Sequence, residues 1–138
     1  MRDGQTRQLE TDPSAGADLF ASFAANWRVS LVILSGSAEG SEWEIARREA
    51  TVGRGNDNTI VIDDSSVSKQ HVAFEFSDSG YRVRDLGSSN GTLLNGSEIR
   101  VAELKHGDRI QLGEHTLQLI LERRNASPRT YVIPDGDQ

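Results

Sequence analysis

The chain has 138 residues, enough for one domain with flanking tails and a sizeable buried core. It has no cysteine, which excludes disulfides, thiol nucleophiles and thiolate metal sites. Its formal net charge is −6, whereas nucleic-acid-binding domains usually carry a basic face, so no nucleic-acid partner is expected. The longest apolar run, residues 31–34, is far shorter than the ~20 residues that span a bilayer. Residues 1–18 lack the apolar core of a secretory signal, so we expect a cytoplasmic protein with no membrane partner.

The N-terminal part of the chain is predicted to be a polar tail followed by a short helix. Residues 1–17 are polar and contain Gly, Pro and Ser, a composition typical of disorder. Residues 18–27 place four apolar side chains at helical spacing: Leu19, Phe20, Phe23 and Trp27. A helix of this length is marginal in water and needs a surface to pack on. We expect it to pack on the domain that follows it, and the alternative is a helix that docks in a partner's groove.

From Arg28 onwards, short apolar segments, many of them alternating, predict strands. These segments cover residues 29–34, 42–46, 60–62, 72–76, 81–84, 110–112 and 116–121. Turn residues separate them, with hairpin signals at 78–80, 95–96 and 113–114. Many short strands at regular spacing predict an all-β sandwich. We therefore divide the chain into an N-terminal tail with its helix (1–27), a β domain (28–123) and a polar C-terminal tail (124–138).

Four islands between the predicted strands carry the candidate site. They are Gly53-Arg54, Ser68-Lys69-Gln70-His71, Ser88-Ser89-Asn90-Gly91-Thr92 and Asn95-Gly96. Together they supply a planar guanidinium that is always charged, hydroxyl donors and an amide, which suit the binding of a phosphate on an extended peptide. Each island alone has a plainer explanation, such as a surface arginine, a turn hydroxyl or a common Asn-Gly turn. The combination favours the binding site.

The sequence around these islands, TVGRGNDNTIVIDDSSVSKQHVAF and YRVRDLGSSNGTLLNGSEI, resembles the forkhead-associated (FHA) family of phosphothreonine-binding domains. The resemblance runs from about Trp27 to about Arg123, and the four islands agree with the family in order and spacing. It implies an FHA-like β-sandwich of two mainly antiparallel sheets, with the ligand-binding loops at one end.

The same resemblance assigns a role to each residue of the islands. Five residues would bind the phosphopeptide. Arg54, Ser68 and Lys69 would face the phosphate, Ser89 would lie beside them, and Asn90 would bind the peptide main chain. Five more would form the loop scaffold, with the histidine bracing the loops from below: Gly53, His71, Gly91, Thr92 and Asn95. Lys69 stands where many relatives carry arginine, and lysine is a point charge without the guanidinium fork.

These assignments predict a phosphothreonine-dependent adaptor in serine/threonine kinase signalling, and no enzyme. The partner would be a phosphothreonine-containing protein that such a kinase modifies. The alternatives are a phosphate-independent interaction module and a regulatory subunit of a larger complex. The three histidines have no metal-ligand spacing, so no metal or cofactor is expected. Ser66-Val67-Ser68-Lys69 matches the S-x-x-K motif of β-lactamases, but the partner motifs of those enzymes are missing.

Three threonines in the tails are candidate phosphosites: Thr6, Thr11 and Thr130. FHA domains often favour an aliphatic or acidic residue three places after the phosphothreonine. Thr6 and Thr130 meet this preference with Leu9 and Ile133, whereas Thr11 does not. The resemblance places both termini at the end away from the loops. We therefore expect phosphorylated Thr6, with its longer tail, to close the site of its own molecule, and phosphorylated Thr130 to dock on a neighbour and cause self-association.

Overall fold

The computed structural model describes residues 13–124 of the chain. Within this range a helix, α1 (Pro13–Asn26), precedes a continuous series of strands. The strands are β2 (Trp27–Ser35), β3 (Glu42–Ile45), β4 (Glu49–Gly53), β5 (Ile60–Val61), β6 (Val72–Ser77), β7 (Gly80–Asp85), β8 (Thr92–Leu94), β9 (Ser97–Ile99), β10 (Val101–Glu103), β11 (Arg109–Leu112) and β12 (His115–Arg123). No helix in the described part is long and apolar enough to cross a membrane.

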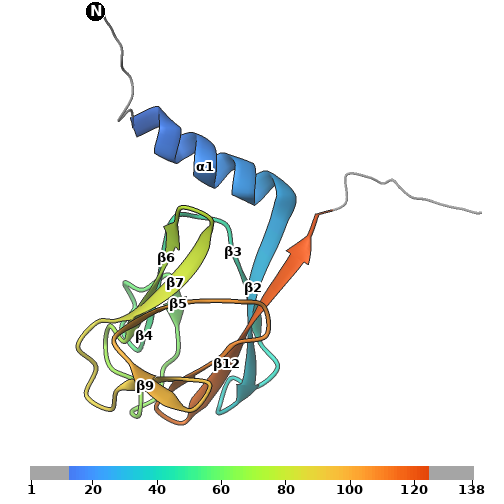
Figure 1. Cartoon of the computed structure of the whole chain (residues 1–138). Coiled ribbons are helices and arrows are strands. Elements are labelled where there is room, and N and C mark those ends of the chain that lie inside the picture. The colour runs from blue at the N-terminus through green and yellow to red at the C-terminus, as the bar shows by residue number, and fades with distance from the viewer. Residues whose placement is uncertain (1–12, 125–138) are drawn as a thin grey trace, which may run out of the picture.

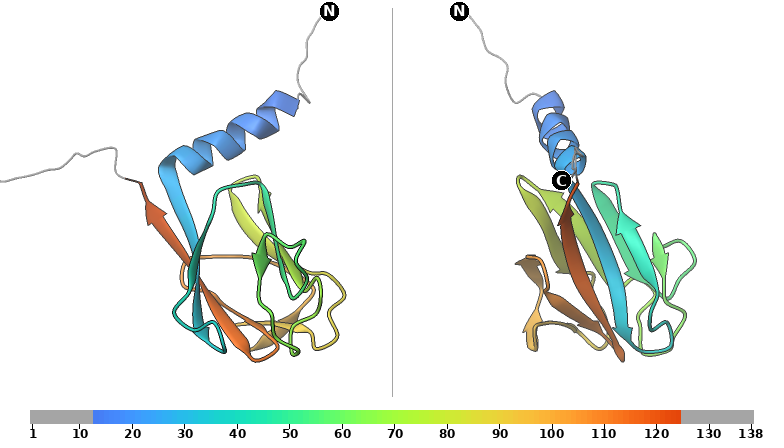
Figure 2. Two further views of the ribbon diagram at one scale, coloured as in Figure 1. Left: turned by 180° about the vertical axis from the view of Figure 1, so that it is seen from behind. Right: turned by 90° about the vertical axis from the view of Figure 1, so that its right-hand side faces the viewer.

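The strands form two sheets that pack against each other (Figures 1 and 2). The five-stranded sheet has the order β10-β7-β6-β4-β5, and the six-stranded sheet has the order β3-β2-β12-β11-β8-β9. The paired strands are antiparallel except β4 and β5, which run parallel. The expected all-β sandwich of two mainly antiparallel sheets is confirmed.

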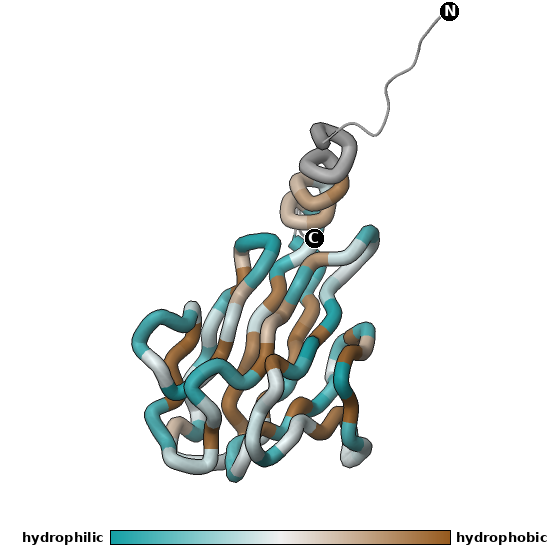
Figure 3. Tube along the Cα trace, turned by 90° about the vertical axis from the view of Figure 1, so that its left-hand side faces the viewer, coloured by the Kyte–Doolittle hydropathy of each residue, from teal (hydrophilic) through white to brown (hydrophobic). Residues whose placement is uncertain are grey.

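The core lies between the sheets and is built from the alternating residues of the longer strands. Val29, Leu31 and Ile33 of β2 are each at most 2% exposed. Two of them lie opposite buried leucines of β12, with Leu31 paired to Leu119 and Ile33 to Leu117. Along the chain, hydrophobic residues concentrate in the strands and hydrophilic residues in the connections (Figure 3). Side chains alternate between the two faces of a strand, so the alternation of apolar and polar residues along each strand determines which face of the sheet points inward.

The three predicted turns are all tight hairpin connections. Ser77 pairs with Gly80, Leu94 with Ser97, and Leu112 with His115, which leaves two residues in each turn. Asn95 and Gly96 both have positive φ angles, 51° and 91°, as a type I′ turn requires. Four strands are missing from the sequence prediction: β8, β9 and β10, which have three residues each, and β4, which has five. Segments of three residues are too short to show an alternating pattern.

Helix α1 differs from its prediction at both ends. It begins at Pro13 instead of Asp18, so residues 13–17 belong to the helix and not to a disordered tail. Proline suits the first helical position because its missing N–H would have no partner there. Trp27 is the first residue of β2 and lies outside the helix. Residues 1–12 and 125–138, with most of the two predicted tails, lie outside the described residues.

The apolar side of α1 packs on its own domain, as expected. Phe20 and Phe23 each lie 5.3 Å from the ring of Phe76, measured between ring centroids, and Phe23 lies 5.9 Å from Tyr81. These are favourable tilted and edge-to-face distances for aromatic pairs. The helix lies across one end of the sandwich, while the turn from β11 into β12 lies at the other (Figure 1).

Candidate functional site

The first three sequence islands meet at the end of the sandwich opposite α1. The antiparallel register brings the end of β4, the start of β6 and the end of β7 together, since Val52 pairs with Val72 and Val72 with Asp85. Hydrogen bonds then join the loops that extend from these strands. Arg54 N donates to Ser68 O at 2.9 Å, and Ser89 N donates to Ser68 Oγ at 2.9 Å. Sites built from loops on a rigid scaffold are a common arrangement for ligand binding.

Arg54 is held by one edge of its guanidinium. Its Nε donates to the carbonyl oxygen of Val67 at 3.0 Å, and its side chain is half-buried. Among the described residues, its two terminal nitrogens have no hydrogen-bond acceptor. The anchored edge fixes the plane of the group, and the remaining N–H groups can donate to a bound anion.

A pocket of about 570 Å³ opens beside Arg54. Ser68, Lys69 and Ser89 line it together with Arg54, so four of the five predicted binding residues share one cavity. The oxygen of Ser68 accepts the amide of Ser89, which leaves the hydroxyl proton of Ser68 able to donate to a ligand. Lys69 is exposed and adds a second positive charge. Asp57 also lines the pocket and is its single carboxylate.

Asn90, the fifth predicted binding residue, lies next to Ser89 on the same loop. Its Nδ2 donates to the carbonyl oxygen of Ser66 at 3.0 Å, which fixes the orientation of the amide. An amide of this kind has two donors and one acceptor oxygen. One donor and Oδ1 therefore remain available to a peptide main chain at the exposed surface.

His71 is fully buried and joins the loop before β6 to the loop before β8. Its Nδ1 accepts the backbone N–H of Ser68 at 3.1 Å, and its Nε2 lies 2.9 Å from the carbonyl oxygen of Gly91. This pair of partners requires the neutral ring with its proton on Nε2. His71 lines none of the pockets at this end, so its position is that of a brace beneath the loops.

Asp85 is a scaffold residue that the sequence prediction missed. Its carboxylate accepts hydrogen bonds from Gly87 N, Ser88 N, Ser88 Oγ and Thr92 Oγ1 at 2.6–2.9 Å. Burial alone would raise its pKa, but the hydrogen bonds from Ser88 and Thr92 outweigh burial and lower the pKa to about 2. The signal was present in the sequence, because an Asp that precedes Gly and Ser favours such a side-chain-bonded turn.

Gly53 and Asn58 set the spacing between the Arg54 and Lys69 loops. A Cβ atom on Gly53 would lie 2.2 Å from the carbonyl oxygen of Lys69, a separation that no side chain can adopt. Asn58 was also missed by the sequence prediction. It is 8% exposed, and its Nδ2 donates to Gly55 O at 2.8 Å and to Lys69 O at 2.6 Å. Only glycine at position 53 lets the two loops approach to this distance.

The remaining scaffold residues divide into two groups. Gly91 and Thr92 lie within the loop, where Gly91 has a φ of 81° and donates its N–H to Ser88 Oγ at 3.0 Å. Asn95 lies apart from the binding loops. It bonds Asp108 at 3.1 Å and the backbone N–H of Arg109 at 3.0 Å, so it stabilises the β8–β9 hairpin against the turn before β11. Its partners among the described residues are thus Asp108 and Arg109, and a role of Asn95 in supporting the ligand loops stays a prediction.

This arrangement defines a β-sandwich with an anion-binding pocket on its loops. Among residues 13–124, no group of three or more His, Asp or Glu side chains is placed to hold a metal ion. The hydrogen-bonded loops leave donors of Arg54 and Ser68 directed to a ligand, and the nearest histidine is occupied as a brace. The geometry suits recognition of an anion and not nucleophilic chemistry.

Comparisons with known proteins agree with this class. The family model for the FHA domain matches residues 50–113. The glycogen accumulation regulator GarA of Mycobacterium tuberculosis is 34% identical over 87 residues, which cover 63% of this chain and 54% of GarA. The oxoglutarate dehydrogenase inhibitor of Corynebacterium jeikeium is 36% identical over 87 residues, which cover 63% of this chain and 60% of that protein. The matched region therefore spans little more than half of these relatives.

Solved structures give the same result. The solution structure of an FHA domain from an Arabidopsis thaliana hypothetical protein is 31% identical, with a TM-score of 0.65, and the match covers 78% of this chain and 93% of that one. A structure from a study of phosphothreonine-dependent FHA domain interactions is 28% identical, with a TM-score of 0.62, and covers 67% and 95% of the two chains. The chain belongs to the FHA domain family. The resemblance seen in the sequence is thus confirmed, as is the expectation that the chain contains a binding module of this family.

Proposed function

We propose that this chain is a cytoplasmic adaptor that binds phosphothreonine-containing proteins. Arg54, Ser68 and Lys69 bind the phosphate, and Ser89 lies beside it. Asn90 binds the main chain of the ligand. The partner is a substrate of a serine/threonine kinase, and the binding unit covers residues 28–123. The net charge of −6 and the local cationic pocket favour a phosphorylated protein over nucleic acid or a membrane as ligand.

The observation that carries this proposal is the state of Arg54. Its Nε is used by Val67 O, and its terminal nitrogens have no acceptor within the described residues, although the side chain is half-buried. A half-buried cation with unused donors, beside a hydroxyl and a lysine, matches a phosphate, which offers three acceptor oxygens. The loop bonds of His71 and Asp85 hold this geometry before a ligand arrives, which lowers the entropy lost on binding.

A second candidate is a phosphate-independent regulator of a metabolic enzyme. It is favoured by the similarity to a protein named oxoglutarate dehydrogenase inhibitor and to the regulator GarA. In this case the domain would bind its partner by a surface other than the Arg54 pocket. Phosphatase treatment of the partner separates the two candidates, since it abolishes binding only in the first.

The test of the main proposal compares a phosphothreonine peptide with its unphosphorylated form. Wild-type protein should bind only the phosphorylated peptide in calorimetry. Arg54→Ala should weaken that binding by about 2–5 kcal/mol, the range for breaking a desolvated charge pair. Its thermal melt should stay near that of the wild type, because Arg54 is a half-buried loop residue and its side chain is not part of the hydrophobic core. A folded Arg54→Ala protein with wild-type affinity would refute the assignment.

We also propose that the tails act as ligands between molecules. Thr6, Thr11 and Thr130 lie outside the described residues, but covalent geometry limits their reach. From Thr6 to Pro13 an extended chain spans at most about 25 Å, and from Arg124 to Thr130 about 21 Å. Strand β12 alone spans ~30 Å from the loop end to the α1 end. Because α1 begins at Pro13, Thr6 loses the slack it was expected to have, and we propose that it also docks on a neighbour.

A further inference from the structure

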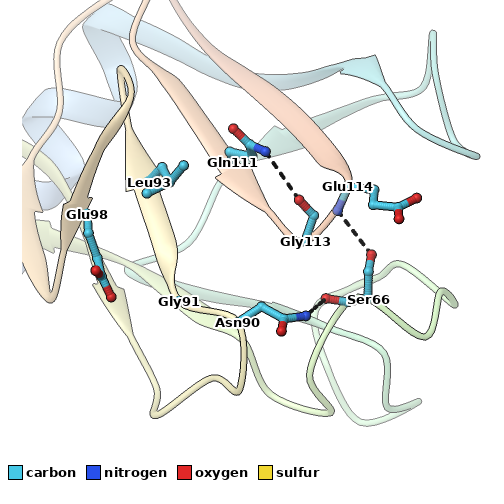
Figure 4. A pocket seen from close by; sticks show the side chains of 8 residues that line it. All are labelled: Ser66, Asn90, Gly91, Leu93, Glu98, Gln111, Gly113 and Glu114. Atoms are coloured by element: carbon cyan, nitrogen blue, oxygen red, sulfur yellow. Dashed lines mark hydrogen bonds between the residues drawn. The ribbon is translucent and has the colours of Figure 1, made fainter.

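Asn90 lines a second pocket (Figure 4), which shares no lining residue with the phosphate pocket beside Arg54. Its volume is about 350 Å³, and its main lining residues are Ser66, Asn90, Leu93, Glu98, Gln111 and Glu114. Ser89 lines the phosphate pocket and the next residue, Asn90, lines this one. A peptide whose main chain is bound by Asn90 therefore has both pockets within reach.

Three strands build the floor of this pocket. Leu93 of β8 lies directly opposite Glu98 of β9 on one side and Gln111 of β11 on the other. Directly opposed residues have Cβ atoms about 5 Å apart, so the three side chains form a row on the outer face of the six-stranded sheet. Leu93 is half-buried at the centre of the row, between a carboxylate and an amide. The floor is thus apolar in the middle and polar at both ends.

Hydrogen bonds use the hydroxyl proton of Ser66 and one N–H of each amide that lines the pocket. Asn90 Nδ2 donates to Ser66 O at 3.0 Å, and Gln111 Nε2 donates to Gly113 O at 3.3 Å. The Ser66 hydroxyl donates to Asp64 Oδ1 at 2.7 Å. Both amide oxygens remain without a partner among the described residues. The lining residues include no cation, and Glu98 forms no salt bridge with any described residue.

The carboxylate of Glu98 is placed for contact with a ligand. Its Oε2 would lie 3.1 Å from a Cβ atom on Gly91, so the carboxylate lies over the backbone of the loop that carries Asn90. The absence of a side chain at Gly91 leaves this space open. The side chain of Glu114 extends away from Leu93 and Gln111, on the opposite side of the pocket from Glu98 (Figure 4). Glu98 is therefore the charge that a bound side chain would meet.

We propose that this pocket takes a lysine or arginine side chain of the phosphothreonine ligand. The aliphatic stem would lie along Leu93, and the cationic head would bind the carboxylate of Glu98, in the manner of long basic side chains on mixed surfaces. The ligand class is then a phosphothreonine peptide with a basic residue near the phosphate. The proposal rests on the proposed function, and it narrows the ligands that the domain selects.

The test is an affinity screen of phosphothreonine peptides against the full chain. Each position flanking the phosphothreonine carries lysine, alanine or glutamate in turn, and affinity is measured by fluorescence anisotropy. At one position we expect lysine to bind about two- to five-fold more tightly than alanine, the size expected for an exposed ion pair. Glutamate should bind more weakly than alanine there. The preference for lysine should vanish in Glu98→Gln and reverse towards glutamate in Glu98→Lys.

Glu122→Lys is the matched control for Glu98→Lys, because both variants change the net charge by the same amount. Glu122 is exposed and lies at the α1 end of β12, far from the pocket. The control should keep the lysine preference, and thermal melts of all three variants should resemble the wild type. An unchanged preference in Glu98→Gln, or equal loss in Glu122→Lys, overturns the pocket assignment. If no phosphopeptide binds at all, the proposed function fails, and this proposal fails with it. If phosphopeptides bind without any basic preference, only this proposal fails.

Discussion

Removal of the His71 ring should reduce both folding stability and ligand affinity. The ring is fully buried and holds the loop before β6 against the loop before β8. In His71→Ala, the amide of Ser68 and the carbonyl of Gly91 both lose their partners. The two loops then lose a fixed separation, and Ser68 and Ser89 no longer present their groups to one ligand.

The size of the stability loss follows from these two groups. A polar group left without a partner in a buried position costs about 1–3 kcal/mol, and a cavity of the size of an imidazole adds to it. We expect a loss of about 2–5 kcal/mol in the free energy of unfolding, measured by urea denaturation without ligand. Ser68→Ala removes a ligand-facing hydroxyl instead, so it should weaken phosphopeptide binding by about 1.5–3 kcal/mol with a smaller effect on unfolding.

Two further variants separate the two hydrogen bonds of the ring. His71→Asn can keep an acceptor near Nδ1, and His71→Gln can keep a donor near Nε2, so each should retain part of the stability lost in His71→Ala. If His71→Ala unfolds at the same urea concentration as the wild type but no longer binds phosphopeptide, the bracing role is wrong. His71 would then contact the ligand directly.

Three other predictions address the scaffold and the tails. Gly53→Ala should abolish or strongly weaken phosphopeptide binding in calorimetry, because its Cβ would meet Lys69 O at 2.2 Å, whereas Gly80→Ala, which meets no atom within 4 Å, should keep wild-type affinity. Asp85→Asn should lower the free energy of unfolding at pH 7 by about 1–2 kcal/mol, a figure discounted for partial exposure. The pKa of Asp85 is about 2 in the folded chain and has its ordinary value of 3.8 in the unfolded chain. The stabilisation by the Asp85 carboxylate is therefore fully present above pH 3.8 and disappears as the pH falls towards 2. A difference between wild type and Asp85→Asn that stays constant from pH 7 to pH 2 would contradict it. Chains phosphorylated at Thr6 or at Thr130 alone should form dimers that dissociate on dilution in light scattering, and a monomer at every concentration with a blocked site would show closure within one molecule instead.

The sequence predicted the sandwich because the long strands show their burial directly. Val29, Leu31 and Ile33 alternate with more polar or less buried positions, and the pattern survives in the structure. Strands β8, β9 and β10 have three residues each, which is too few to show such a pattern. The start of α1 was missed for a related reason. Pro13, Ser14 and Gly16 are typical of loops, so local composition favoured a tail there.

The sequence predicted which residues form the candidate site, but not the hydrogen bonds that connect their loops. Arg54, Ser68, Lys69 and Ser89 were expected near one another, and they line one pocket. Asn58 was not expected, because its bond to Lys69 O joins two loops whose spacing depends on the whole sandwich. Asp85 was missed although its bonds stay within its own loop. The hydrogen bond from Asn95 to Asp108 was not expected either, because the two residues are thirteen positions apart in the sequence.

The ligand-facing residues and the residues that hold them are different side chains for a physical reason. An anion site needs donors without partners, and such donors are tolerated only near solvent, because a buried unpaired donor costs about 1–3 kcal/mol. Loops near solvent are mobile unless their own backbone groups are bonded. Here His71, Asn58 and Asp85 bond the loop backbone from beneath. The charge of Asp85 is taken up by four loop donors, and it forms no salt bridge with Arg54 or Lys69. The scaffold therefore fixes the loops without neutralising the two cations that the phosphate needs.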